Sequence, residues 1–194
     1  MAVMRTRHAK AMTLREWADL PDDVPGELVD GVLVEEEMAS LPHEVVVVFL
    51  LRLFGWVDDR GGLTLSSDWK YGVAAKRGRK PDLSVFLPGT PTPTAQERFG
   101  THPPDIAVEV ITPTPRDARR DRIEKMGEYA RFGIRWYWLV DPILRSVEIF
   151  ELGERRRYTL VTSVGNGVVP VPGCRGMKLD VDKLWARVDK YSPT

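Results

Sequence analysis

The chain has 194 residues, with 28 basic and 28 acidic side chains, so its formal net charge is zero and gives no sign of a nucleic-acid partner. A local basic patch would still suffice to bind one. The length fits a single domain, which we place at residues 12–188 between flexible termini at 1–11 and 189–194. The single cysteine, Cys174, excludes an intramolecular disulfide and a cysteine-based zinc site. No apolar run reaches 18 residues, so we expect no membrane span and a cytoplasmic location.

The N-terminal part of the chain predicts two helices and a hairpin. Residues 12–20 have an amphipathic pattern that opens with a Thr-x-x-Glu capping box. The Asp30-Gly31 pair lies between apolar runs and predicts a β-hairpin over residues 27–35. The apolar run at residues 43–58 is too long for most strands and predicts a buried helix.

The middle of the chain predicts a sheet with a charged interior position. Strands are expected at residues 63–71, 82–87 and 105–111, the last being a continuous apolar run typical of a central strand. The basic, glycine-containing stretch at residues 72–80 predicts a turn, and the Pro- and Thr-rich residues 88–104 predict a loop or a short helix that crosses an edge.

The last third predicts a helix followed by peripheral strands. Residues 117–132 have helical spacing, with Ile123, Met126 and Ala130 on one expected buried face and Gly133 as the stop. Further strands are expected at 136–140, 146–151, 158–164 and 168–171, and a closing helix at 182–188.

Two carboxylates stand out from this pattern. Asp82 opens one apolar strand, and Glu109 lies inside another. An ionised carboxylate in an apolar strand is costly unless it is paired or binds a cation. Mg²⁺ prefers one or two carboxylates, with waters and substrate phosphate completing its shell. The pattern therefore indicates a divalent-metal site.

Several short motifs carry a resemblance to a known family. They are Gly26–Gly31, His43, Lys80-Pro81-Asp82, the stretch from Pro104 to Pro113 around Glu109, Asp121, Lys125, Tyr129, and the stretch from Gly133 to Pro142. Together they resemble the Uma-type restriction endonucleases, a branch of the PD-(D/E)XK superfamily. The resemblance implies a restriction endonuclease-like core: an α/β fold with a central mixed β-sheet flanked by helices, preceded by an N-terminal helix and hairpin.

The same resemblance assigns the catalytic and metal-binding residues. Asp82 and Glu109 would bind Mg²⁺ or Mn²⁺ with the Val110 carbonyl. The superfamily lysine normally follows the glutamate by two residues, where this chain has an isoleucine. Lys125 on the next helix would replace it and orient the attacking water, and Glu27 would bind a second ion or orient water. The implied activity is metal-dependent cleavage of phosphodiester bonds, in DNA.

The sequence also gives expectations for substrate contacts and for assembly. His43, Arg79, Arg119 and Tyr129 are candidates for contacts to DNA, which needs cationic and polar groups at its phosphates. The aromatic pair Trp136 and Trp138 shares one strand face and serves either the core or a dimer contact. From that apolar surface we predict a homodimer.

Alternatives remain open for each residue and for the function. Asp82 can merely begin a strand, Glu109 can pair with an arginine, and Lys125 can be a solvated surface charge. The zero net charge and the missing strand lysine favour a non-catalytic DNA-binding or protein-interaction module on a nuclease scaffold. A third possibility is a metal-dependent hydrolase of another phosphate ester.

Overall fold

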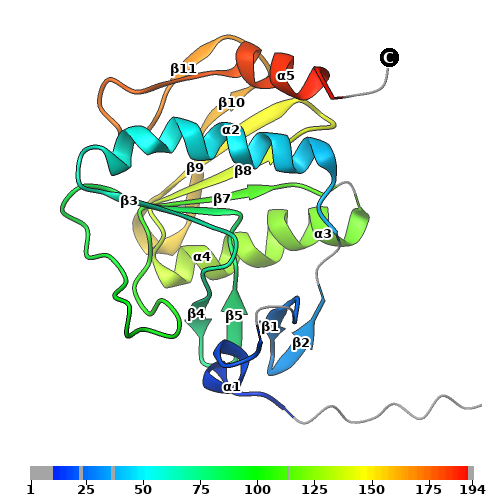
Figure 1. The fold of residues 1–194 in the computed structure, drawn as a ribbon, viewed down its shortest axis with the longest axis vertical. Helices are drawn as coiled ribbons and strands as arrows, with labels where there is room; N and C mark the ends of the chain where they lie inside the picture. The colour runs from blue at the N-terminus through cyan, green and yellow to red at the C-terminus, as the bar shows by residue number, and fades with distance from the viewer. Residues whose placement is uncertain (1–10, 22–23, 36–37, 113, 192–194) are drawn as a thin grey trace, which may run out of the picture.

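The fold has a large and a small β-sheet. The structure, a computed structural model, describes residues 11–21, 24–35, 38–112 and 114–191. A six-stranded mixed sheet with helices on both faces forms the centre, and a four-stranded sheet lies at one end beside helix α1 (Figure 1). The predicted α/β class with a central mixed sheet is confirmed. Within the described ranges, no helix is long and apolar enough to cross a membrane.

The large sheet has the order β10-β9-β8-β7-β6-β3, and its only parallel pair is β7 with β8. Its strands are β3 (Leu63–Ser66), β6 (Leu83–Phe86), β7 (Ile106–Val110), β8 (Trp136–Asp141), β9 (Ser146–Leu152) and β10 (Tyr158–Val164). The small sheet contains β1 (Glu27–Val29), β2 (Val32–Val34), β4 (Tyr71–Ala74) and β5 (Arg77–Arg79), and β11 (Val168–Pro170) pairs with β12 (Lys178–Asp180). The helices are α1 (Leu14–Ala18), α2 (Leu41–Asp58), α3 (Pro115–Arg119), the π-helix η1 (Arg120–Lys125), α4 (Met126–Phe132), the short 3₁₀-helix η2 (Glu154–Arg156) and α5 (Val181–Asp189).

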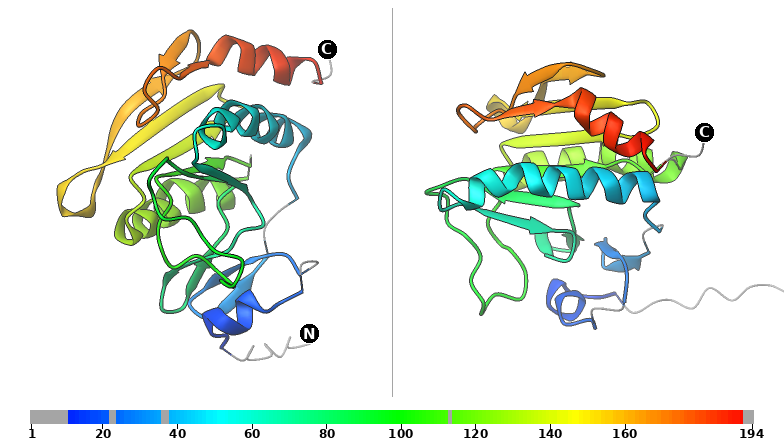
Figure 2. Two further views of the ribbon diagram at one scale, coloured as in Figure 1. Left: turned by 60° about the vertical axis from the view of Figure 1, so that its left-hand side comes forward. Right: turned by 45° about the horizontal axis from the view of Figure 1, so that its top comes forward.

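Two hydrophobic cores cover the two faces of the large sheet. Figure 2 shows α2 and α5 lying beside each other over one face, and α4 lies over the other face. Along β7, Val108 and Val110 pack in the core with α2, whereas Ala107 packs in the core with α4. Because strand side chains alternate, Glu109 falls on the α4 face. This placement turns the carboxylate toward the helical stretch of η1 and α4, in which Lys125 is the last residue of η1.

The small sheet corrects one prediction. Its hairpin β1–β2 turns at Asp30 and Gly31, whose φ angles of 51° and 80° fit the predicted Asp-Gly turn. The expected turn at residues 72–80 is wrong, because this stretch forms the antiparallel pair β4–β5. A Cβ atom on Gly78 would lie 2.2 Å from the Trp17 ring, so β5 needs glycine at this close approach. The predicted strand at residues 63–71 is likewise split between the two sheets.

The predicted apolar face of the helical stretch before Gly133 is buried only in part: Ala130 is 3% exposed and Met126 packs against the core. The stretch is divided into α3, η1 and α4, and Ile123 is 61% exposed. Asp121 and Lys125 are buried instead. Gly133, with a φ angle of 110°, ends α4 as expected. Ile123 departs from the prediction, because at this part of the helical stretch Asp121 and Lys125 are the side chains that face the polar pocket.

The structure also places the residues on which the assembly prediction rested. Trp136 and Trp138 are 4% and 0% exposed and pack in the core with α2, so they supply no surface for a dimer contact. Cys174 is buried, which raises the pKa of its thiol to about 11. Asp189 is the last residue of α5, and residues 1–10 and 192–194 lie outside the described residues.

Candidate active site

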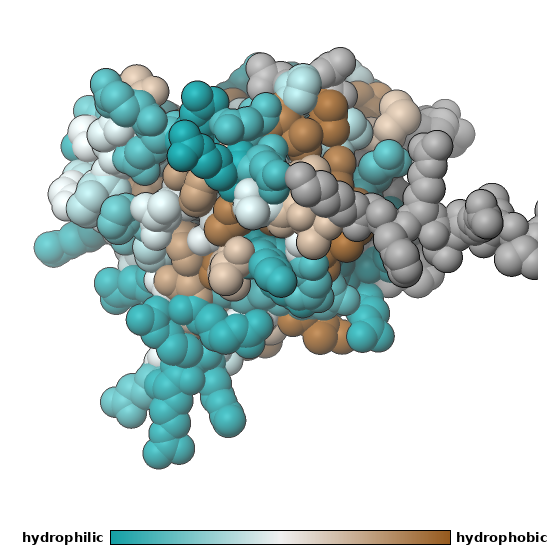
Figure 3. All heavy atoms as spheres, turned by 90° about the horizontal axis from the view of Figure 1, so that it is seen from below, coloured by the Kyte–Doolittle hydropathy of each residue, from teal (hydrophilic) through white to brown (hydrophobic). Residues whose placement is uncertain are grey.

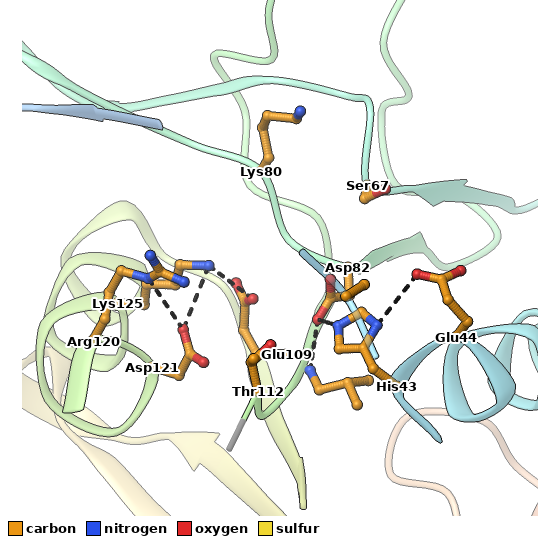
Figure 4. A pocket seen from close by; sticks show the side chains of 12 residues that line it. His43, Glu44, Ser67, Lys80, Asp82, Glu109, Thr112, Arg120, Asp121 and Lys125 are labelled. Atoms are coloured by element: carbon orange, nitrogen blue, oxygen red, sulfur yellow. Dashed lines mark hydrogen bonds and ion pairs between the residues drawn. The ribbon is translucent and has the colours of Figure 1, made fainter. Parts of the chain in front are cut away.

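Asp82 and Glu109 meet in one pocket at the end of strands β6 and β7. These strands are antiparallel, and Leu83 pairs with Val108. One step further along the pair, Asp82 therefore lies opposite Glu109. The pocket has a volume of about 160 Å³ (Figure 4). Its lining residues are Ala39, His43, Glu44, Ser67, Lys80, Asp82, Glu109, Val110, Thr112, Arg120, Asp121 and Lys125. Glu109 thus lies in β7, and Asp82 directly precedes the adjacent strand β6.

Glu109 is a buried carboxylate with both oxygens engaged. Lys125 Nζ donates to Oε2 at 2.8 Å, and the Tyr129 hydroxyl donates to Oε1 at 2.6 Å. Burial raises the pKa of Glu109 well above its ordinary value, and the nearby acids Asp121 and Asp82 act in the same direction against Lys125. Lys125 thus favours the ionised form of Glu109, against burial and the neighbouring acids.

Asp82 is held at the pocket by a backbone donor and a histidine. The Val110 amide donates to Asp82 Oδ2 at 2.6 Å, and His43 Nε2 lies 3.2 Å from the same oxygen. Burial alone would lower the pKa of His43, but the hydrogen bond to Asp82 and its charge outweigh burial and raise it. His43 thus contacts Asp82 from helix α2, and its other ring nitrogen, Nδ1, lies 3.5 Å from Glu44.

Lys125 is surrounded by three carboxylates. Its ammonium lies 2.8 Å from Glu109, 3.2 Å from Glu27 and 3.5 Å from Asp121. The side chain is 2% exposed, so the solvated-surface alternative is wrong. Spacing of four residues along the helix brings Asp121 and Lys125 to the same side, as the sequence indicated. Figure 4 shows the Lys125 ammonium between the carboxylates of Glu109 and Asp121.

Three of the predicted site residues lie behind the pocket instead of lining it. Glu27 is 1% exposed and accepts hydrogen bonds from Arg79 and the Lys80 amide. Burial would raise the pKa of Glu27, but Lys125, Arg79 and the amide together lower it. Arg79 and Tyr129 are both 0% exposed, so neither is accessible to substrate and their predicted substrate contacts are not supported. These residues support the pocket from within the fold.

Arg119 does not line the pocket either. Its side chain is 69% exposed and lies 3.8 Å from Glu124. The cations that do line it beside Lys125 are Lys80, which ends the basic stretch at residues 72–80, and Arg120. Glu128 was missed entirely, although it lies one helical turn after Lys125 and is 4% exposed. The only sequence signal for a role of Glu128 was its spacing of three residues from Lys125.

The pocket suits a cation. Among the residues that the structure describes, no group of three or more His, Cys, Asp or Glu side chains is arranged to hold a metal ion alone. Two carboxylates and a backbone carbonyl, with waters and phosphate oxygens, nevertheless match what Mg²⁺ requires. Asp121 Oδ1 is buried without a hydrogen-bond donor, and burial raises the pKa of this carboxyl. Lys125 Nζ lies 3.5 Å and Arg120 Nε 3.7 Å from this oxygen, so Asp121 is paired by charge although it accepts no hydrogen bond there.

A mixed sheet that brings two carboxylates and a lysine together at the end of adjacent strands is the arrangement of a restriction endonuclease-like protein. The sequence model of the Uma2 family, described as "Putative restriction endonuclease", matches residues 13–182, and the chain belongs to this family. Its fold is similar to the crystal structure of a "putative nuclease belonging to DUF820" from Anabaena variabilis ATCC 29413. The TM-score is 0.72 at 18% identity, covering 91% of this chain and 99% of that one. No curated protein matches the chain.

Proposed function

We propose that this protein is a metal-dependent endonuclease that hydrolyses phosphodiester bonds in DNA. The observation that carries the proposal is the convergence of Asp82, Glu109 and Lys125 in one pocket, with the ammonium 2.8 Å from Glu109. Membership of the Uma2 family supports the nuclease class. Beyond the nuclease class, we propose that the protein uses a divalent metal and that its substrate is DNA.

The metal would be held by Asp82, Glu109 and the Val110 carbonyl, and Mg²⁺ or Mn²⁺ fits these oxygen ligands. When bound, it would polarise a phosphoryl oxygen and lower the pKa of a bound water. Lys125 would orient the attacking water and stabilise negative charge that develops on the phosphate. His43 would hold Asp82 in place.

The supporting residues take different roles from those expected of them. Tyr129 would fix the rotamer of Glu109 through its 2.6 Å hydrogen bond. Glu27 would hold Lys125 from behind, because its oxygens face Lys125 and Arg79 and it does not line the pocket. Lys80 and Arg120 would contact substrate phosphates, since both line the pocket and carry positive charge.

Cleavage of supercoiled plasmid and of single-stranded DNA tests the proposal. The wild type should cut with Mg²⁺ or Mn²⁺ and not with EDTA, and Asp82→Asn should be inactive. Asp105→Asn is a matched control, because Asp105 precedes β7 and its carboxylate likewise accepts a backbone hydrogen bond, from Leu87 at 2.7 Å. Asp105 does not line the pocket. Equal loss in both variants would contradict the assignment of the site.

One observation favours a non-catalytic DNA-binding module instead. Both oxygens of Glu109 already accept hydrogen bonds within the protein, so a metal must compete with Lys125 and Tyr129 for them. DNA binding that is unchanged by Asp82→Asn, together with no cleavage at any metal concentration, would support that module. Turnover of small phosphate esters without DNA cleavage would support the third class, a hydrolase of another ester.

The oligomeric state, the domain boundaries and the cellular location of the protein stay predictions. We propose a single domain over residues 12–188, a homodimer and a cytoplasmic location, where the buried thiol of Cys174 stays reduced. On the face drawn in Figure 3, hydrophobic side chains lie in small groups between hydrophilic ones. Light scattering at micromolar concentration should give twice the mass of 22.0 kDa, and a monomer mass would refute the dimer.

A further inference from the structure

Glu128 on helix α4 is a buried acid that the proposed reaction does not use. It is 4% exposed and lies outside the lining of the pocket. Its carboxylate takes hydrogen bonds from two nitrogens of Arg79, Nε at 2.6 Å and Nη2 at 3.1 Å, and also pairs with Arg77. A buried carboxylate with this many charge-assisted contacts is fixed in one orientation.

Arg79 connects Glu128 to Glu27, so the orientation of Glu128 also fixes that of Glu27. The guanidinium is planar, so two bonds to Glu128 also fix the direction of its third nitrogen. This nitrogen, Nη1, donates to Glu27 Oε2 at 2.7 Å. Arg79 is fully buried, so these bonds lie away from bulk solvent. The position of Glu27 therefore follows from the position of Glu128.

Glu27 in turn faces the proposed catalytic lysine. Its Oε1 accepts from the Lys80 amide at 2.9 Å and lies 3.2 Å from Lys125 Nζ. Charges thus alternate along a buried relay from Glu128 through Arg79 and Glu27 to Lys125. Because Lys125 and Glu128 are three residues apart on one helical stretch, the relay ties that stretch to strands β5 and β1 of the small sheet.

We propose that Glu128 is a positioning residue, which sets the Lys125 ammonium beside Glu109 through Arg79 and Glu27. A lysine on a helix has four rotatable bonds and many rotamers, and the relay selects the one that reaches Glu109. The inference rests on the proposed function only where it concerns the rate of cleavage. The placement of Lys125 itself is a property of the folded protein.

The test compares Glu128→Gln with Glu148→Gln. The first variant keeps the size of the side chain and removes its charge. The second makes the same change in another ion pair, where Glu148 lies 2.5 Å from Arg122 and away from the pocket. Brief acetylation of each folded protein, read by mass spectrometry, reports the accessibility of Lys125 against Lys183, whose side chain is 78% exposed. Cleavage kinetics are measured on the same samples.

In the wild type, Lys125 should be acetylated far more slowly than Lys183. Glu128→Gln should raise the acetylation rate of Lys125 and lower kcat by about 10- to 100-fold with little change in KM, because a small misplacement of a catalytic group costs this much. Glu148→Gln should change neither. If Glu128→Gln does not fold, Arg79→Lys replaces it, since an ammonium cannot bind both carboxylates as the planar fork does.

Each result decides the inference. Unchanged acetylation of Lys125 in a folded Glu128→Gln or Arg79→Lys protein overturns it, and so does a wild type in which Lys125 reacts as fast as Lys183. A change in KM alone would place Glu128 in substrate binding and also overturn it. A wild type that cuts no nucleic acid would refute the proposed function, while the acetylation pattern would still decide the role of Glu128.

Discussion

Replacing Lys125 by methionine should be one of the most damaging single changes in this protein. Methionine keeps the unbranched shape of the stem but leaves Glu27, Glu109 and Asp121 without the ammonium that lies within 3.5 Å of each. Removal of one partner from a buried ion pair costs about 3–5 kcal/mol, because the remaining charge is buried and uncompensated. For a chain of this size, that loss corresponds to a fall in Tm of roughly 6–20 °C.

The penalty should depend on pH in a defined direction. Burial raises the pKa of Glu109 and Asp121. An acid whose pKa is raised in the folded state stabilises that state below its unfolded value, near 4, and this stability is lost as pH rises through the raised value. Without Lys125 both acids lose a favourable charge, so the folded variant should bind protons more readily still. The destabilisation should therefore be largest at pH 8 and smaller at pH 5.

Urea denaturation of the wild type and Lys125→Met at both pH values measures this effect. The double variant Lys125→Met with Glu109→Gln should recover part of the loss, since it removes both members of the closest pair. Lys183→Met is the matched control and should change little, because Lys183 is exposed and pairs only with Asp180 at the surface. A Lys125→Met protein less than about 1 kcal/mol weaker than the wild type, or a penalty that does not change with pH, would refute the buried-charge argument.

Three further predictions address the metal, the substrate and the small sheet. Millimolar Mn²⁺ should raise the free energy of unfolding by roughly 2.7 kcal/mol at 100 times its dissociation constant, and Asp82→Asn should abolish this effect in thermal melts. Lys80→Ala should lower the slope of log affinity against log salt by about 1 in DNA-binding titrations, because it removes one phosphate contact. Figure 4 shows the Lys80 side chain extending away from the carboxylates, as such a contact requires. Gly78→Ala should cost about 1–3 kcal/mol in denaturant, since its Cβ would overlap the Trp17 ring, and an unchanged midpoint would contradict that close approach.

Local sequence signals were sufficient for much of the fold. The Asp30-Gly31 turn needed only the positive φ that these residues accept, and Gly133 ended its helix for the same reason. The strand pair β4–β5 could not be predicted in this way. Its buried face at β5 carries Arg79, whose burial depends on acids from β1 and α4, and apolar alternation does not record such contacts.

The residues of the site likewise differ in whether the sequence alone could reveal them. Asp82 and Glu109 were recognisable because a carboxylate in an apolar strand is unusual. Glu128 was not, because a glutamate on a helix normally faces solvent. Its burial arises from Arg79, which is 49 residues away in the chain. Only the three-dimensional arrangement could show that this glutamate belongs to the support of the site.

The position of the lysine explains why the small sheet belongs to the site. Ile111 stands where a strand lysine would follow Glu109, and it is buried in the core beneath α4. A strand lysine would share the rigid backbone of its glutamate, whereas Lys125 reaches Glu109 from a separate helical segment. Its placement therefore depends on how that segment docks, and Glu27 from β1 and Arg79 from β5 provide the docking contacts. The hairpin and its neighbouring strands hold the acidic and basic groups in one geometry, although they contribute no carboxylate to the pocket itself.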